Sequence, residues 1–313
     1  MADNHTHIEP DQRPTGGAEE LTLADQVAKA ASVGVNRIVQ CGCELDSARW
    51  TAEVAIRNPA VVGAIAIHPN EAPRIVRRGG TGSQVDAAAI HPNEATRRTR
   101  QSGPGSQVDA AAIHPNEAPR RAPHGDLDAQ MDAVFGMAGE VERIRAIGET
   151  GLDYYRTRDP ADQEISRRAF RDHIAAAKQL DLALQIHDRD AHADVIAILE
   201  QDGAPDRTVF HCFSGDRTMS EHLARRGWYV SVAGPVTFTS NNALREAIRA
   251  VPLEYLLVET DAPYLTPHPY RGRPNAPYMV AHTVRALADL LDQPLETLCR
   301  ALDANTTRVY GTW

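Results

Sequence analysis

Histidines and acidic residues stand at the ends of several apolar runs in this sequence, where they could bind divalent metal ions. His5 and His7 are two residues apart, so in an extended strand both imidazoles lie on one face and can reach one ion. Glu149 lies in a Gly-Glu-Thr-Gly string, whose glycines let the backbone come close to a ligand. Asp261 closely follows an apolar run, where burying a carboxylate without a cationic partner is costly. The candidate ligands are His5, His7, Glu149, His187, His211 and Asp261.

Four imidazoles and two carboxylates suit two divalent ions with a position left open for water. Such an ion lowers the pKa of bound water toward neutrality and so creates a nucleophile for hydrolysis. The ligand types therefore predict a metal-dependent hydrolase that uses Mg, Mn or Zn. They do not distinguish attack on phosphorus from attack on a carbonyl carbon, because both reactions need the same nucleophile.

Apolar runs rich in β-branched residues alternate with amphipathic runs, which predicts strands alternating with helices. The Thr22-x-x-Asp25 string predicts a capping box at the start of the first helix. The expected strands span residues 1–5, 37–43, 61–68, 143–151, 182–187, 208–213, 228–233 and 255–259. The expected helices span residues 21–33, 47–57, 127–142, 161–180, 191–201, 217–226, 242–250, 279–291 and 295–302.

Eight strands alternating with helices predict an α/β fold with a parallel sheet and right-handed crossovers. An open doubly wound sheet fits the same alternation, but no Gly-x-Gly-x-x-Gly string follows the first strand, which argues against the Rossmann version. We therefore expect a TIM-like (β/α)8 barrel. The candidate ligands and His68 all fall at C-terminal strand ends, the side of a TIM barrel that carries the active site.

A tandem repeat interrupts this pattern. The string Ala-Ile-His-Pro-Asn-Glu-Ala places histidines at His68, His91 and His114, 23 residues apart each time. Only the first copy continues a strand pattern, and the near-identity of the copies indicates a duplicated segment. We predict one β/α-barrel domain over residues 1–313, with an inserted, mobile surface loop at about 75–123. His91 and His114 are expected to be bystanders.

The bulk composition is that of a globular protein, with 42% hydrophobic and 24% charged residues. A net charge of −9 argues against a broad duplex-binding face, so a nucleic acid substrate would be engaged as a DNA end or a short single strand. Four cysteines, with Cys41 and Cys43 separated by a single residue, predict reduced thiols. No membrane span, secretory signal or obligate protein partner is evident, so we expect a cytoplasmic protein.

Seven strings, in the same order, resemble those of the TatD family of metal-dependent deoxyribonucleases and cover nearly the whole chain outside the repeats. Two of them, Glu-Thr-Asp-Ala-Pro-Tyr-Leu and His-Cys-Phe-Ser-Gly, are quite specific. The strings are Asp3-Asn-His-Thr-His7, Ile67-His-Pro69, Gly148-Glu-Thr-Gly-Leu-Asp-Tyr-Tyr155, Gln185-Ile-His-Asp-Arg-Asp-Ala191, His211-Cys-Phe-Ser-Gly215, Glu259-Thr-Asp-Ala-Pro-Tyr-Leu265 and Arg271-Gly-Arg-Pro-Asn-Ala-Pro277.

The resemblance implies a divalent-metal-dependent exodeoxyribonuclease that cleaves phosphodiester bonds from 3' to 5' with Mg, Mn or Zn. The chain departs from the family pattern in a first strand clipped to two residues before Asp3, and in the repeats that follow the third strand beside the active face. The implied first ion is held by His5, His7 and Asp261 and the second by His187 and His211, with Glu149 bridging the two.

On this basis Glu149 and Asp261 are the expected catalytic residues, with Asp261 accepting a proton from the activated water. Arginines are expected to grip phosphate oxygens, because a guanidinium group forms paired hydrogen bonds to them. The expected substrate-binding residues are His68, which lines the cleft, and Arg189, Arg271 and Arg273.

Two alternatives remain open. The same metal-activated water could hydrolyse an ester or amide, such as the bond that joins a D-amino acid to tRNA, a reaction of some TatD-like proteins. The chain could also be an inactive barrel whose cleft the repeat insert obstructs. Assays on single-stranded DNA and on mischarged tRNA would distinguish the first alternative from DNA cleavage. Activity that appears only after deletion of residues 75–120 would indicate the second alternative.

Overall fold

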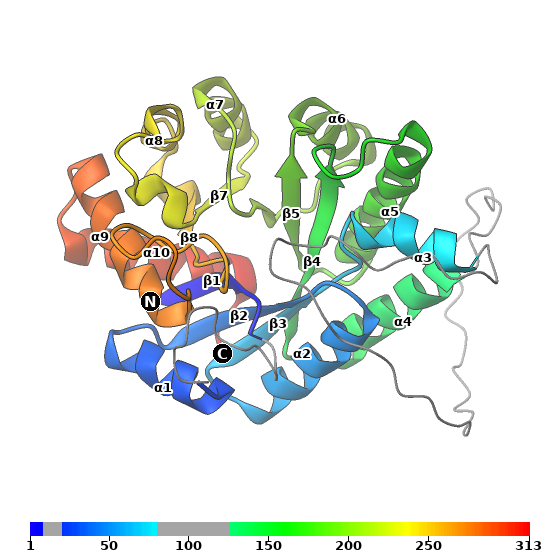
Figure 1. Cartoon of the computed structure of the whole chain (residues 1–313), viewed down its shortest axis with the longest axis horizontal. Coiled ribbons are helices and arrows are strands. Elements are labelled where there is room, and N and C mark those ends of the chain that lie inside the picture. Colours follow the sequence, from blue (N-terminus) through cyan, green and yellow to red (C-terminus); the bar gives the residue numbers. More distant parts are fainter. Residues whose placement is uncertain (9–20, 80–125) are drawn as a thin grey trace.

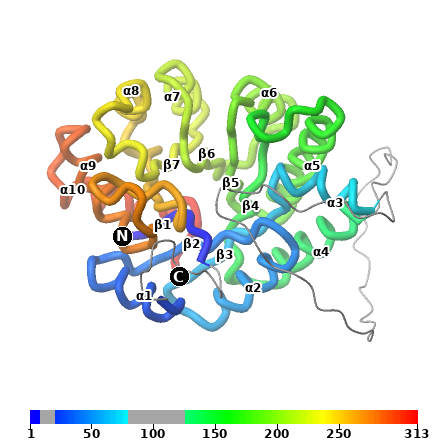
Figure 2. The backbone as a smooth tube through the Cα atoms, viewed as in Figure 1, coloured from blue at the N-terminus to red at the C-terminus, as the bar shows by residue number. Residues whose placement is uncertain are grey.

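A computed structural model describes residues 1–8, 21–79 and 126–313. Its eight strands form one parallel sheet in which the strand order follows the sequence. Figure 1 shows helices surrounding these strands, and the sequence colours in Figure 2 run once around the molecule. The strands are β1 (Ala2–Thr6), β2 (Arg37–Gly42), β3 (Val61–Ile65), β4 (Ile144–Asp153), β5 (Ala183–Arg189), β6 (Thr208–Phe210), β7 (Tyr229–Val232) and β8 (Leu256–Val258).

Helices connect the strands, as expected for a barrel built from β/α units. They are α1 (Leu23–Ser32), α2 (Leu45–Arg57), α3 (Glu71–Gly79), α4 (Asp126–Glu140), α5 (Pro160–Gln179), α6 (His192–Asp202), α7 (Arg217–Arg225), α8 (Asn242–Arg249), α9 (Val280–Leu291) and α10 (Leu295–Tyr310). Three short 3-10 turns are η1 (Gly234–Thr237), η2 (Leu253–Tyr255) and η3 (Pro277–Met279). The predicted TIM-like barrel is confirmed, and so is the capping box at Thr22 and Asp25.

The barrel is nearly closed where β1 meets β8 and the segment that follows it. The buried Asp3 carboxylate accepts hydrogen bonds from the Thr260 backbone N–H at 2.8 Å and from its hydroxyl at 2.6 Å. The Asp261 N–H donates to the His5 carbonyl at 3.0 Å. The short first strand is therefore a paired and fully buried part of the barrel, and its closure brings two candidate ligands together.

Alternating strand residues face two different cores. One set, such as Ile38, Leu184 and Phe210, packs against the surrounding helices. The other set comes from β2 to β8 and fills the barrel interior, because successive side chains of a strand point to opposite faces. This interior cluster consists of Val39, Cys41, Val62, Ala64, Ala146, Ala183, Val209, Tyr229 and Leu257, together with Val309 and Tyr310 of α10.

The last residues of α10 form a floor beneath the site. The amide nitrogen of Gln185 on β5 donates to the Tyr310 hydroxyl at 2.7 Å and to the Asn4 carbonyl at 2.8 Å. Both Gln185 and Tyr310 are buried, and their polar side-chain atoms have hydrogen-bond partners, as burial requires. Polar side chains therefore begin directly above the apolar interior, at the carboxyl ends of the strands.

Two helices differ from the sequence prediction. Helix α3, which contains Pro73 in its first turn, was not predicted, because the repeat suggested an inserted loop from about residue 75. Proline is tolerated in the first turn of a helix, where its missing N–H costs nothing, and Ile75 is buried against the core. Helix α10 continues past residue 302 because the Asn305 amide on its buried face donates to two backbone carbonyls. Residues 80–123 of the predicted insert, including His91 and His114, lie outside the described residues.

No helix in the described part of the chain has both the length and the apolar character needed to cross a membrane.

His173 on α5 holds the segment that follows β3. Its Nε2 accepts the Ile67 N–H at 3.1 Å, so the neutral ring must carry its proton on Nδ1, which donates to the Ala169 carbonyl at 2.6 Å. Burial lowers the pKa of His173 to about 4. The neutral ring thus fixes the backbone immediately before His68.

We predict that His173 contributes to loss of stability in acid. Its pKa is about 4 in the fold and 6.5 ordinarily, so the unfolded chain binds more protons and the contribution is lost as the pH falls from 6.5 to 4. About 2.5 pKa units correspond to roughly 3 kcal/mol in the free energy of unfolding. Urea unfolding of His173→Gln should therefore show a shallower loss of stability across this interval. A slope equal to that of the parent would contradict the prediction.

Candidate metal centre

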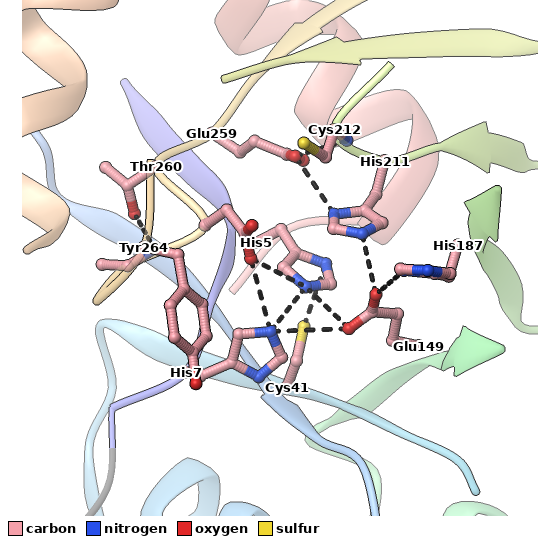
Figure 3. A network of polar contacts seen from close by, with 12 residues as sticks. His5, His7, Cys41, Glu149, His187, His211, Cys212, Glu259, Thr260 and Tyr264 are labelled. Carbon is pink, nitrogen blue, oxygen red and sulfur yellow. Dashed lines mark hydrogen bonds and ion pairs between the residues drawn. The ribbon is translucent and has the colours of Figure 1, made fainter. Parts of the chain in front are cut away.

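Glu149 lies at the centre of the polar cluster, with five histidines around its carboxylate (Figure 3 shows four of them). It is the sixth of the ten residues of β4, and only 4% of its surface is exposed. Its Oε2 is 3.6 Å from His5 Nε2 and 3.5 Å from His7 Nε2. Its Oε1 is 3.4 Å from His68 Nε2, 2.5 Å from His187 Nδ1 and 2.9 Å from His211 Nε2. The two oxygens therefore face two separate groups of imidazoles.

The group on the Oε2 side also contains Asp261. Its Oδ1 is 3.5 Å from His7 Nε2 and 3.9 Å from His5 Nε2, and the two imidazole nitrogens are 3.1 Å apart. Atoms that each lie about 2.0–2.2 Å from one ion are separated by such distances. We call the atoms contributed by His5, His7, Glu149 and Asp261 the first cluster.

The local backbone conformation positions the side chains of the first cluster, both at the two histidines and at Asp261. His5 is the fourth residue of β1, and His7 directly follows the strand, two positions after His5, so the two imidazoles share a face. Asp261 has a left-handed backbone with φ of 53°, which is uncommon for a residue with a side chain. Hydrogen bonds from Asp261 N to the His5 carbonyl and from Tyr264 N to the Asp261 carbonyl hold that conformation.

The group on the Oε1 side joins residues from three strand ends. His187 is on β5, His211 directly follows β6, and His68 follows β3. The sequence suggested only that His68 lines the cleft, whereas here its Nε2 approaches Glu149 together with His187. We call the atoms contributed by His68, Glu149, His187 and His211 the second cluster. All six predicted ligands thus lie in two clusters that share Glu149.

The second ring nitrogens of three histidines have defined partners that the sequence interpretation missed. His5 Nδ1 is 3.1 Å from Gln185 Oε1, which must be the acceptor because the Gln185 nitrogen already donates to two oxygens. His5 therefore carries its proton on Nδ1, and the Nε2 lone pair faces the first cluster. His211 Nδ1 lies 3.1 Å from Glu259 Oε1.

Asp153 plays the corresponding role for His187. Its Oδ2 lies 3.2 Å from His187 Nε2 and accepts a hydrogen bond from the Asn70 amide at 3.0 Å. Partners of this kind orient metal-binding histidines and raise their basicity. The signal in the sequence was a polar residue in a buried strand two positions from a ligand, as in Gln185-Ile-His187 and Glu259-Thr-Asp261.

The ionisable groups around Glu149 change one another's pKa values. Burial would raise the pKa of Glu149, but His211, His68 and His187 lower it well below its usual value. Burial would lower the pKa of His187, but the Glu149 carboxylate and a hydrogen bond to Asp153 raise it to about 9. For His211, burial is likewise overcome by Glu149 and Glu259, and its pKa is raised. The Glu149 carboxylate is therefore ionised and surrounded by groups that compensate its charge.

A cavity of about 430 Å³ opens onto both clusters. Arg189, the last residue of β5, lines it and stacks on the Tyr155 ring, with the guanidinium carbon 4.0 Å from the ring centroid. Arg271 instead lines a neighbouring cavity of about 560 Å³, and Leu265 lines both. Arg273 lines neither of these two cavities. Arg74 and Arg156, which the sequence interpretation did not select, also line the first cavity.

All four cysteines are free thiols, as the sequence predicted. Cys43 and Cys212 line the cavity that holds the clusters. Cys41 lies deeper, with 2% of its surface exposed. No local pattern in the sequence indicated that these thiols lie beside the candidate metal ligands.

Comparisons with known proteins extend over nearly the whole chain. Residues 2–311 match the family model described as TatD related DNase. The uncharacterized metal-dependent hydrolase TatD of Mycobacterium tuberculosis is 34% identical over 320 residues, which cover 99% of this chain and 98% of that protein. The crystal structure of YJJV, a TatD homologue from Escherichia coli, is similar with a TM-score of 0.70 at 22% identity, covering 98% of this chain and 97% of that chain. A TatD family hydrolase from Entamoeba histolytica gives a TM-score of 0.71 at 16% identity, covering 100% and 98%.

We predict that Glu259 positions His211 for metal binding. Replacing Glu259 with glutamine removes the charged acceptor at His211 Nδ1, and loss of such a partner typically weakens metal affinity by about tenfold to a hundredfold. Competition for Zn²⁺ against a chelating dye measures this effect. The exposed Glu254 provides the matched control, since Glu254→Gln should bind Zn²⁺ as the parent does. Equal affinities for Glu259→Gln and the parent would show that this partner is dispensable.

Proposed function

This chain belongs to the TatD-related DNase family of metal-dependent hydrolases, and from that premise we propose that it is a 3'-5' exodeoxyribonuclease that uses two divalent ions. The observation that supports the proposal best is the position of Glu149. Each of its two carboxylate oxygens faces a different group of ligand atoms, as a carboxylate that bridges two ions would. The proposed ligands are His5, His7, Glu149, His187, His211 and Asp261, with His68 beside the second ion.

The residues present fit a pair of such ions. The donors are imidazole nitrogens and carboxylate oxygens, a set that accepts Mg²⁺, Mn²⁺ or Zn²⁺. Two carboxylates and five histidines converge at strand ends, and Glu149 and His5 are almost completely buried. A divalent cation would compensate the buried carboxylates, which burial otherwise disfavours in their charged form.

Bound divalent ions supply positive charge that lowers the pKa of water and stabilises the leaving oxygen of a phosphodiester. The protein contributes positions and proton acceptors. Asp261 lies at the cavity wall beside His7, where its carboxylate accepts the proton of the attacking water. Arg189 lies on the same wall, with its guanidinium fixed against Tyr155, and donates to a phosphate oxygen.

The size and charge of the site favour a nucleic acid end. A cavity of about 430 Å³ is in the range of small-ligand sites, so it accepts one or a few terminal nucleotides and not the face of a duplex. A net charge of −9 gives little support to a broad phosphate-binding surface. The positive charge needed at the substrate is local, from the ions and from the arginines of the cavity.

We predict that Asp261→Asn abolishes metal-dependent nuclease activity while the fold persists. The variant loses a carboxylate of the first cluster and the acceptor of the water proton. Release of nucleotides from 3'-labelled single-stranded DNA measures the loss, and Asp206→Asn at an exposed position should retain parental activity. Turnover by Asp261→Asn within tenfold of the parent would refute the assignment. Hydrolysis of mischarged tRNA without cleavage of DNA would identify the deacylase alternative.

We also predict that Arg189 contributes to substrate binding. Arg189→Ala should raise KM for single-stranded DNA about tenfold, because a guanidinium–phosphate hydrogen bond contributes about 1.5 kcal/mol or more. Arg273→Ala should change KM less than twofold, because Arg273 lines neither cavity. Steady-state kinetics on a labelled oligonucleotide test both variants. Equal effects at the two positions would contradict the distinction drawn from their places in the structure.

A further inference from the structure

Two cysteines on the second strand lie beside the two histidines of the first strand. Cys41 is in β2 and Cys43 follows that strand, with the same two-residue spacing as His5 and His7. Because β1 and β2 pair in parallel, the Cys-x-Cys and His-x-His segments run alongside one another. Cys41 Sγ is 3.3 Å from His5 Nδ1, and Cys43 Sγ is 3.8 Å from His7 Nδ1. The sulfur atoms of Cys41 and Cys43 thus lie in the neighbourhood of the first cluster.

The two thiols occupy different positions relative to the ligand atoms. Cys41 is buried beside His5 (Figure 3), and its Sγ donates to Gln185 Oε1 at 3.3 Å. Cys43 is only partly buried and lines the cavity. Its Sγ lies 3.6 Å from Glu149 Oε2, the carboxylate oxygen that belongs to the first cluster. Of these two thiols, Cys43 is therefore the one whose sulfur lies beside a carboxylate oxygen of the first cluster.

The backbone holds Cys43 in this place. Its N–H donates to the Ser47 hydroxyl at 2.9 Å, where the first turn of α2 begins next to the strand. The sulfur then forms a set with His7 and Glu149 in which the potential ligand atoms all lie within 4.8 Å of one another. A set of nitrogen, oxygen and sulfur donors of this kind suits a borderline or soft divalent ion.

We propose that Cys43 is an additional ligand of the ion held by His5, His7, Glu149 and Asp261. When the ion binds, the Sγ–H bond breaks, its proton passes to solvent, and a sulfur lone pair forms the bond to the ion. A thiolate donor favours Zn²⁺ and other thiophilic ions over Mg²⁺. This inference rests on the proposed function, because it requires an ion in the first cluster, and it adds a ligand and a metal preference to that function.

Cobalt absorption tests the ligand without reference to activity. Co²⁺ added to the full chain should give visible bands from the metal ion and a near-ultraviolet band from thiolate-to-cobalt charge transfer. Cys43→Ser should lose the near-ultraviolet band and keep the visible bands. Cys299→Ser, on α10, serves as the matched control and should keep both. Retention of the near-ultraviolet band in Cys43→Ser, with its loss in Cys212→Ser, would overturn the proposal and assign the sulfur ligand to Cys212.

Metal competition provides the second measurement. Cys43→Ser should lower the affinity for Zn²⁺ by at least about tenfold and the affinity for Mn²⁺ by less than threefold. Equal losses for both ions would show that Cys43 acts only by orienting His7, and would overturn the proposal. If the parent protein shows the visible cobalt bands but no near-ultraviolet charge-transfer band, the sulfur ligand is refuted and the proposed two-ion function is not. Absence of cobalt binding would refute both.

Discussion

The ionised carboxylate of Glu149 is the constraint on which the rest of the site depends. A buried negative charge is stable only with compensating charge and hydrogen bonds, and here five histidines from several strand ends supply them. Those histidines can converge only if the parallel strands close into a barrel, because the carboxyl ends of all strands then face one opening. The buried charge of Glu149 is therefore stable only in a fold that closes into a barrel.

The interior of the barrel changes from apolar to polar along its axis, and hydrogen bonds at this boundary orient the candidate ligands. Tyr310 completes the apolar floor, and its hydroxyl accepts a hydrogen bond from the Gln185 amide. That bond turns Gln185 Oε1 toward His5 and so determines which imidazole nitrogen faces the first cluster. A residue near the end of the chain thereby influences the protonation of one near its beginning. Helix α10 is thus part of the support of the site as well as of the core.

The residues that converge on Glu149 were easier to predict from the sequence than the residues that support them. His5, His7 and Asp261 could be found because strand ends, two-residue spacing and a carboxylate after an apolar run are local features. Gln185 and Glu259 were missed because their importance depends on partners across the barrel, which local patterns do not specify. The position of Cys43 depends in the same way on the pairing of β1 with β2, since one residue alone does not indicate which neighbour it faces. Helix α3 was missed for a different reason, because a conspicuous repeat obscured a weaker helical pattern.

Tertiary hydrogen bonds determine the position of the first copy of the repeat. His173 binds the Ile67 N–H, the Ser166 hydroxyl donates to the Pro69 carbonyl at 3.0 Å, and the Asn70 amide reaches Asp153. These partners lie on β4 and α5 and occur once in the chain, whereas the Ile-His-Pro-Asn string occurs three times. The string is therefore insufficient to define a site residue, and His68 acquires its place from partners that no other copy can share at the same time. Identity of sequence therefore does not imply an equivalent position in the fold, because each hydrogen-bonding partner can serve only a limited number of groups.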